Sequence, residues 1–287
     1  IILLSSIIFL ISFNYYVINN NGLKTRLPQI FNKKLKETNI NFHQKVNTQK
    51  VILIGDSHSD SLEFHLNEKI KEKNLSLYRF GTLIYLKDFN LIDSKTKKID
   101  QNYFESNIKI DDFLEENSNL IVIFNQRWSN RILETLFDNE EGYKEEENLK
   151  YENYFEPINI KTSSLQQRQK YIREGLLFQI NKIINQGHKL ILVYPVPEMA
   201  FNVPLILKHK FFKLRNLNSY QIPVLSVSYE MYKKRNRLIF EILDSVESPN
   251  IYKVYPHKLF CDKQIENRCV ANDKENIFYY DDDHLSI

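Results

Sequence analysis

A short apolar run ends at a glycine and leads directly into a polar turn and a helical pattern. This order constrains the fold more than any other feature of the chain. The run is VILIG, residues 51–55, and a continuous apolar segment stopped by glycine predicts a fully buried strand of a parallel sheet. From Ser59 to Ile70 apolar side chains recur at helical spacing, so Ser59 or Asp60 is expected to cap a helix. A strand, a tight turn and a helix N-terminus therefore follow one another within a few residues.

Further apolar runs alternate with periodic segments along the chain. The runs expected to form strands are residues 75–80, 120–124, 189–194 and 251–255. Two long periodic segments predict helices: one runs from Ser164 to Gly187, a typical C-terminal glycine, and the other covers residues 228–246. Strands that alternate with helices indicate the α/β class, with a doubly wound parallel sheet and helices on both faces. In such sheets ligands bind beyond the carboxyl ends of the strands.

Composition divides the chain into three parts. Residues 1–19 open with IILLSSIIFLISFNYYVI, which is apolar and uncharged, and predict a transmembrane helix; a signal peptide and a buried core helix are the alternatives. Residues 20–49 are polar and predict a linker, which leaves residues 50–287 for one catalytic domain. Because the first residue is Ile1 and the chain stops just after a motif described below, we expect a fragment at both ends, with the catalytic domain truncated at its C-terminus.

A serine stands where the first strand gives way to its helix. The segment Gly55-Asp56-Ser57-His58-Ser59 follows the buried run directly, so Ser57 is expected at the carboxyl end of a strand and at a helix N-terminus. Free backbone N–H groups and the positive end of the helix dipole at such a point stabilise an oxyanion as it forms. Ser57 is therefore the candidate nucleophile, and a serine that only caps the helix is the alternative.

The last residues set an aspartate three positions before a histidine. In DDDHLS, residues 281–286, a turn brings the Asp281 carboxylate within reach of Nδ1 of His284, which leaves Nε2 to accept the serine proton. We therefore predict a catalytic triad of Ser57, His284 and Asp281. An acidic surface turn is the alternative. Three adjacent carboxylates also suit a divalent cation, but no second cluster completes such a site, so no metal is expected.

The two cysteines, Cys261 and Cys269, lie in a polar loop shortly before that final block. They complete no zinc site, since four ligands are needed and no histidine pair lies nearby. A disulfide between them is expected and implies an oxidising compartment, which favours the periplasm. The lysines and arginines that follow the apolar opening favour the cytoplasmic side instead, and we give the disulfide more weight.

Three further features predict little chemistry. His58 adjoins Ser57, but neighbouring residues on a turn point apart, so His58 is expected to be structural. The acidic stretch at residues 140–147 is expected to be a solvated surface loop. The formal charge of only +3 gives no case for a nucleic-acid partner, which would require clustered basic surface.

As a pair and in this order, the GDSHS and DDDHLS blocks resemble the first and last sequence blocks of the SGNH hydrolase superfamily. The sequence is still more similar to the SGNH domain that follows the membrane domain in acyltransferase-3 proteins, which O-acetylate bacterial cell-surface sugars. The apolar opening, the Tyr-Pro-Val-Pro-Glu run at residues 194–198 and the cysteine pair support this narrower resemblance, which covers residues 50–287. It implies an SGNH, flavodoxin-like three-layer α/β/α fold preceded by a transmembrane helix.

The resemblance also implies further site residues. In the superfamily a glycine after the second strand and an asparagine after the third donate to the oxyanion, and by position these are Gly81 and Asn125. The usual Gly-x-Asn-Asp block is absent, and FNQRWS at residues 124–129 is similar to the Arg-Trp variant of acyltransferase-3 SGNH domains. Arg127 is expected to bind or orient substrate. Trp128, the only tryptophan, forms either a sugar-stacking wall or part of the core.

The implied function is transfer of an acyl group, with acetyl expected, to hydroxyls of a bacterial cell-surface carbohydrate such as lipopolysaccharide, through a Ser57 acyl-enzyme. The alternatives are a membrane-anchored carbohydrate esterase or lipase and a catalytically silent glycan-binding module. No cofactor is expected, since the resemblance implies that the chain's own upstream membrane domain supplies the acyl donor from acetyl-CoA. The implied location is the bacterial inner membrane, with the catalytic domain on the periplasmic side.

Overall fold

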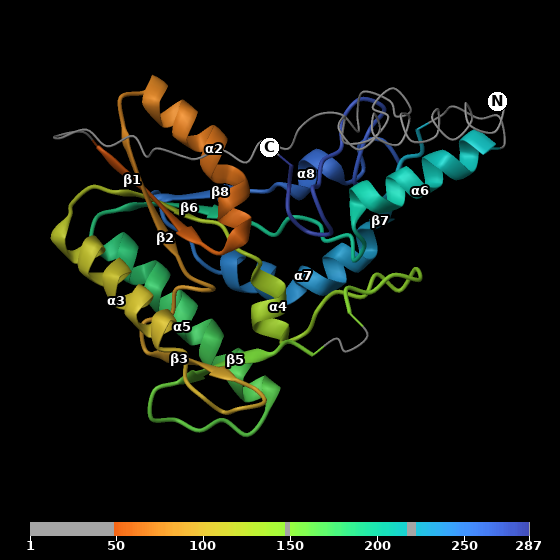
Figure 1. Ribbon diagram of the computed structural model, residues 1–287. Coiled ribbons are helices and arrows are strands. Elements are labelled where there is room, and N and C mark those ends of the chain that lie inside the picture. Colours follow the sequence, from red (N-terminus) through yellow and green to blue (C-terminus); the bar gives the residue numbers. More distant parts are fainter. Residues whose placement is uncertain (1–48, 147–149, 217–221, 287) are drawn as a thin grey trace, which may run out of the picture.

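A five-stranded parallel sheet lies at the centre of the computed structural model, which describes residues 49–146, 150–216 and 222–286 (Figure 1). The strands lie in the order β2-β1-β4-β6-β8, and each neighbouring pair is parallel. Their bounds are β1 Lys50–Gly55, β2 Ser76–Gly81, β4 Ile121–Phe124, β6 Lys189–Val193 and β8 Ile251–Val254. Counted along the chain, this is the flavodoxin-like order 2-1-3-4-5. The predicted parallel α/β sheet is confirmed, and each of its strands falls on a predicted apolar run.

Helices cover the two faces of this sheet unequally. Successive side chains on a strand point to opposite faces, so Ile52 and Ile54 of β1 point into the main core while Val51 and Leu53 point the other way. The main core lies against α3 (Gln101–Glu116), α5 (Leu165–Asn185) and α7 (Tyr229–Asp244). On the opposite face lies α2 (Ser57–Glu72), as Figure 1 shows. The carboxyl end of β1 and the start of α2 thus meet at one edge of the sheet.

The helix ends follow the polar residues of the sequence, with one correction. Helix α5 begins after Ser164, whose hydroxyl accepts a hydrogen bond from the N–H of Gln167, and Gly187 follows it at a φ of +82°, as predicted. Helix α2 starts earlier than predicted. Its cap is Asp56, which accepts a hydrogen bond from the N–H of His58, and not Ser59 or Asp60. The nucleophile candidate is therefore the first residue of the helix.

A second, smaller core lies beyond the carboxyl ends of the strands. Its elements are α6 (Val203–Asn216), α8 (His257–Phe260) and an antiparallel pair formed by β7 (Ser226–Ser228) and β9 (Arg268–Val270). Cys261 and Cys269 are joined by a disulfide within it, as predicted. The remaining elements are α4 (Trp128–Leu133) and an antiparallel pair made by β3 (Phe89–Asp93) and β5 (Asn153–Pro157). These short strands do not fall on predicted apolar runs.

In the part of the chain that the structure describes, no helix has the length and apolar character needed to cross a membrane. The predicted transmembrane helix at residues 1–19 and all but the last residue of the predicted linker lie outside the described residues.

Candidate active site

The turn that carries Ser57 is closed tightly against the end of β4. Gly55 lies so close to this strand that a Cβ there would overlap the carbonyl oxygen of Asn125 and the hydroxyl of Ser59. The Ser59 hydroxyl donates to that same carbonyl, and the Asn125 side-chain amide donates to the carbonyl of His58 at 2.8 Å. Glycine is required here because backbone approaches backbone. The contacts fix Ser57 at an exposed position on the first turn of α2.

Ser57, His284 and Asp281 lie within hydrogen-bond distance in series. The Ser57 hydroxyl oxygen is 2.7 Å from Nε2 of His284, and Nδ1 of His284 is 2.8 Å from Oδ2 of Asp281. A carboxylate on Nδ1 requires the proton to be there, so in the neutral imidazole Nε2 accepts from Ser57. The structure therefore brings together the three predicted residues, from opposite ends of the chain, in the geometry of a serine nucleophile and its base.

The final segment is held in place by a turn and by the loop after β6. Asp281 also accepts hydrogen bonds through Oδ1 from the N–H groups of Asp283 and His284, which closes the turn. The N–H of Met199 donates to the carbonyl of Asp282 at 2.8 Å, so the loop is bonded directly to the acidic block. The Tyr-Pro-Val-Pro-Glu run thus has a structural reason to accompany the site: the loop that it begins positions the base.

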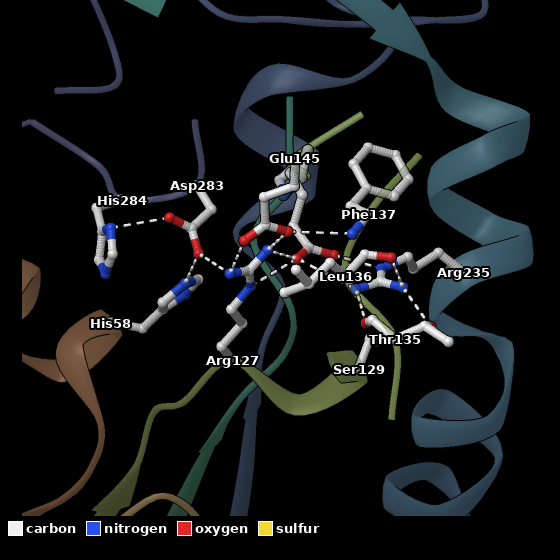
Figure 2. Close-up of polar contacts among 12 residues, drawn as sticks. His58, Arg127, Ser129, Thr135, Leu136, Phe137, Glu145, Arg235, Asp283 and His284 are labelled. Carbon is white, nitrogen blue, oxygen red and sulfur yellow. Dashed lines mark hydrogen bonds and ion pairs between the residues drawn. The ribbon is translucent and has the colours of Figure 1, made fainter. Parts of the chain in front are cut away.

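A second carboxylate, Asp283, contacts the imidazole, although it is not one of the predicted site residues. Its Oδ1 lies 2.8 Å from Nδ1 of His284, and its Oδ2 lies 3.1 Å from Nε2 of His58 (Figure 2). His58 is buried, and its ring centroid lies 5.0 Å from that of His284. His58, which was predicted to be structural, therefore lies next to the site and contacts Asp283. The adjacent acidic residues in DDDHLS were the available signal, because a short turn can present more than one of them.

Behind Asp283 lies a buried ion network centred on Arg127. Its Nη1 is 2.9 Å from Asp283, its Nη2 is 2.7 Å from Glu145, and its Nε donates to Glu198 at 2.6 Å. Glu198 also pairs with Arg235 at 2.6 Å. Figure 2 shows the contacts running in one line from His284 to Arg235. The Arg127 side chain is thus held by three carboxylates behind His284, and its predicted role in binding or orienting substrate stays a prediction. The acidic stretch is largely exposed over residues 140–146, as predicted, but Glu145 is the exception because it pairs with Arg127.

Trp128 belongs to the core. It is 1% exposed, and its indole N–H donates to the carbonyl of Val193 at 2.9 Å. The core alternative holds and the sugar-stacking alternative is wrong, because no face of the ring is open to a ligand. Asn125 is 4% exposed, and its amide braces the turn through His58, so the structure gives no support for its place in an oxyanion hole. Gly81 lies beside Ser57, as described next.

One cavity of about 430 Å³ opens beside Ser57. Its lining includes Gly55 and Gly81 at the ends of two neighbouring strands, with Leu83, Leu91 and Tyr103 as apolar walls. Gly81 keeps its predicted place at the carboxyl end of the second strand. A substrate in this cavity would approach Ser57 where the edge of the sheet and the N-terminus of α2 meet, which is the expected ligand position in such a fold.

The charges around the imidazole change its protonation. Burial disfavours the charged form of His284, but hydrogen bonds to Asp281 and Asp283 and their negative charges outweigh it and raise its pKa. Burial also opposes the charge of Asp283, yet His284, His58 and Arg127 lower the pKa of that carboxyl. Asp282 differs, since burial and the neighbouring Asp283 raise its pKa to about 6. Asp283 is therefore an anion at neutral pH and His284 a stronger base than an exposed histidine.

Ligand atoms of His58, Asp283 and His284 lie within 4.8 Å of one another, as do those of the three consecutive aspartates. Both groups include Asp283, which already contacts the guanidinium of Arg127. A bound cation would have to displace or repel that charge, so these groups do not fit a metal well.

The fold and this geometry define an α/β protein with a serine, histidine and aspartate site at the carboxyl edge of a parallel sheet. The family model described as "SGNH domain (fused to AT3 domains)" matches residues 29–287. The chain therefore belongs to this family, as the resemblance of its two end blocks predicts.

Among solved structures, the lipopolysaccharide acetyltransferase periplasmic domain of Salmonella ser. Paratyphi A is similar. The TM-score is 0.50 at 16% identity, with 84% of this chain and 79% of that domain covered, so the likeness shows the fold. No curated protein sequence matches the chain.

Proposed function

We propose that the domain transfers an acyl group, acetyl in the simplest case, to a hydroxyl of a bacterial cell-surface carbohydrate through an acyl-enzyme on Ser57. The observation that carries this proposal is the 2.7 Å distance between the Ser57 hydroxyl oxygen and Nε2 of His284, whose Nδ1 faces a carboxylate. Membership in a family fused to AT3 domains supports acyl transfer as the general chemistry.

The steps follow from the positions of the atoms. His284 accepts the Ser57 proton at Nε2 as the hydroxyl oxygen attacks the carbonyl carbon of the acyl donor, and the leaving group then takes that proton from Nε2. The acceptor hydroxyl gives its proton to Nε2 and attacks the acyl-Ser57 carbonyl, and Ser57 regains a proton as the ester breaks. Backbone N–H groups at the start of α2, with that of Gly81 as a further candidate, stabilise the oxyanion in both steps.

The proposal extends to location and partners. A disulfide between Cys261 and Cys269 supports a periplasmic location, because disulfides persist in oxidising compartments. The family's fusion to AT3 domains supports an upstream membrane domain as the partner that delivers the acyl group, with acetyl-CoA as its source. The similar Salmonella structure, a lipopolysaccharide acetyltransferase periplasmic domain, supports the same assignment.

Hydrolysis of an ester is the second candidate function, and the exposure of Ser57 favours it. An exposed nucleophile is open to water, and the same three residues serve water or a sugar hydroxyl as acceptor. The two reactions differ only in what resolves the acyl-enzyme.

The test is the intact mass of the chain during incubation with p-nitrophenyl acetate, with Ser57→Ala as the matched control. We expect one acetyl group on the wild type and none on the variant, and faster loss of that group when candidate glycans are added. Loss at one rate with or without glycan would instead establish an esterase. A folded wild type that binds glycan but gains no acetyl group would contradict both and leave a silent binding module.

A further inference from the structure

We propose that Asp283 is a second positioning acid of the site, which shares the Nδ1 proton of His284 with Asp281. The inference rests on the proposed function, because it concerns the base that activates Ser57. It differs from the sequence motif, which singles out only the aspartate three positions before the histidine.

Both carboxylates reach the same nitrogen. Asp281 Oδ2 and Asp283 Oδ1 each lie 2.8 Å from Nδ1 of His284. A single N–H group can be shared between two acceptors at this distance, and both acceptors favour the tautomer with the proton on Nδ1. The two distances are equal, with the Asp281 contact a hydrogen bond and the Asp283 contact an ion pair, so Asp283 is placed to act on the same nitrogen as Asp281.

Burial distinguishes the two carboxylates. The side chain of Asp283 is 3% exposed, while that of Asp281 is 24% exposed. Solvent weakens charge interactions less at a buried group. The attraction of Asp283 to a histidinium at His284 is therefore weakened less by solvent than that of Asp281. Asp281 also accepts two main-chain hydrogen bonds that close the turn, so part of its role is to shape the backbone.

The far side of Asp283 is held by Arg127 and His58. Its Oδ2 faces Arg127 at 2.9 Å and His58 at 3.1 Å. Arg127 is itself fixed by Glu145 and Glu198, so the carboxylate is anchored to the interior through a chain of ion pairs (Figure 2). A carboxylate anchored in this way keeps its orientation when a substrate enters, which is the property that a positioning residue requires.

Several groups set the charge around His284. They come from the final turn, from helix α2 and from the Arg127 network. The titratable residues among them are Asp281, Asp282, Asp283, Tyr280, His58, Asp60, Arg127 and Glu145. The two carboxylates in contact with Nδ1 raise the pKa of His284. Removing either negative charge must therefore lower that pKa, and the neutral, basic form then persists to lower pH.

The first experiment measures acetylation of Ser57 by p-nitrophenyl acetate as a function of pH in the full chain. The variants are Asp281→Asn, Asp283→Asn and the double substitution. Loss of a sole triad aspartate lowers the rate by about 10⁴-fold, so we expect that loss only in the double variant. Each single variant should lose about 100-fold or less and should move the midpoint of the pH profile to lower pH. A loss of about 10⁴-fold in Asp281→Asn alone, with an unmoved midpoint in Asp283→Asn, would overturn the proposal.

A second measurement needs no turnover. Nuclear magnetic resonance titration of the His284 ring nitrogens gives its pKa in the wild type and each variant, and Asp282→Asn is the matched control, since it removes a neighbouring carboxylate that no contact joins to Nδ1. We expect a larger fall in pKa for Asp283→Asn than for the control, and an equal fall would refute the shared proton. If the wild type gains no acetyl group, the proposed function fails while this titration still decides the role of Asp283. If Asp283→Asn does not fold, the acetylation rate of Asp281→Asn decides the role of Asp283. A loss of about 100-fold or less supports the proposal, and a loss of about 10⁴-fold contradicts it.

Discussion

The hydroxyl of Tyr279 donates a hydrogen bond of 2.8 Å to the carbonyl oxygen of Pro197. This contact joins the loop after β6 to the segment that carries His284, although the two lie far apart in the sequence. Tyr279 is fully buried in the smaller core, so the bond is protected from water. His284 is therefore positioned by packing in a core to which Ser57 does not belong.

Tyr279→Phe should lower the free energy of unfolding by about 1 to 2 kcal/mol, because it leaves the buried carbonyl of Pro197 without its donor. The acetylation rate of Ser57 should also fall, since the loop then holds the final turn less firmly. Chemical denaturation and the mass assay measure the two effects. Tyr280→Phe is the control: that ring is 42% exposed, and the substitution should change stability little. Equal losses in the two variants would contradict the prediction.

Glu198→Gln should destabilise the fold by about 3 to 5 kcal/mol, because it leaves Arg127 and Arg235 buried without their shared anion. Thermal or urea unfolding measures this. Glu72→Gln, which breaks an exposed pair with Lys69, is the control and should cost under about 1 kcal/mol.

Glu198 also gives the stability a predictable pH dependence. Burial opposes its charge, but the two arginines outweigh that and lower its pKa to about 2. A carboxyl with a lowered folded-state pKa stabilises the fold above its unfolded value, near 4.5, and that stabilisation is lost as pH falls toward 2. The contribution lost is about 3 kcal/mol. In Glu198→Gln the stability between pH 5 and 2 should fall less steeply than in the wild type, and parallel curves would contradict this.

Gly55→Ala should destabilise the chain by about 2 to 4 kcal/mol and abolish acetylation of Ser57, because the new Cβ meets the carbonyl of Asn125. The end of β1 would have to move away from β4, and Ser57 would move with it. Gly81→Ala is the matched control for stability: a Cβ there meets only the Arg79 guanidinium, at 3.8 Å. Unfolding measurements should show that Gly55→Ala is less stable than Gly81→Ala. Similar stabilities of the two variants would show that the turn tolerates a side chain at position 55.

Replacement of Cys261 and Cys269 by alanine should lower the free energy of unfolding by about 2.5 kcal/mol, the chain-entropy value for a loop of this small size. Thermal unfolding of the double variant measures it. Reductant should lower the stability of the wild type toward that of the variant and leave the variant unchanged. A wild type whose unfolding is insensitive to reductant would show that the bond is absent in solution.

Much of the architecture could be predicted because it depends on local patterns. Each strand of the parallel sheet is a short apolar run, and the alternation of strands and long amphipathic helices leaves few arrangements. The strands β3 and β5 were missed because they are short and show no clear alternation of apolar and polar residues. The Asp56 cap was missed because several residues of the turn are able to cap a helix, and only the backbone path selects one.

The sequence by itself determined the candidate nucleophile, its candidate base and one candidate acid, because a strand, turn and helix place Ser57 locally and a short turn joins Asp281 to His284. Only the tertiary structure decided what surrounds them. Which carboxylates Arg127 contacts, whether Trp128 is open or buried, and whether Asp283 reaches the imidazole all depend on which distant segments pack together. Such contacts join residues from the segment after β4, the loop after β6 and the last turn. The type of a side chain does not reveal which residues of distant segments will contact it.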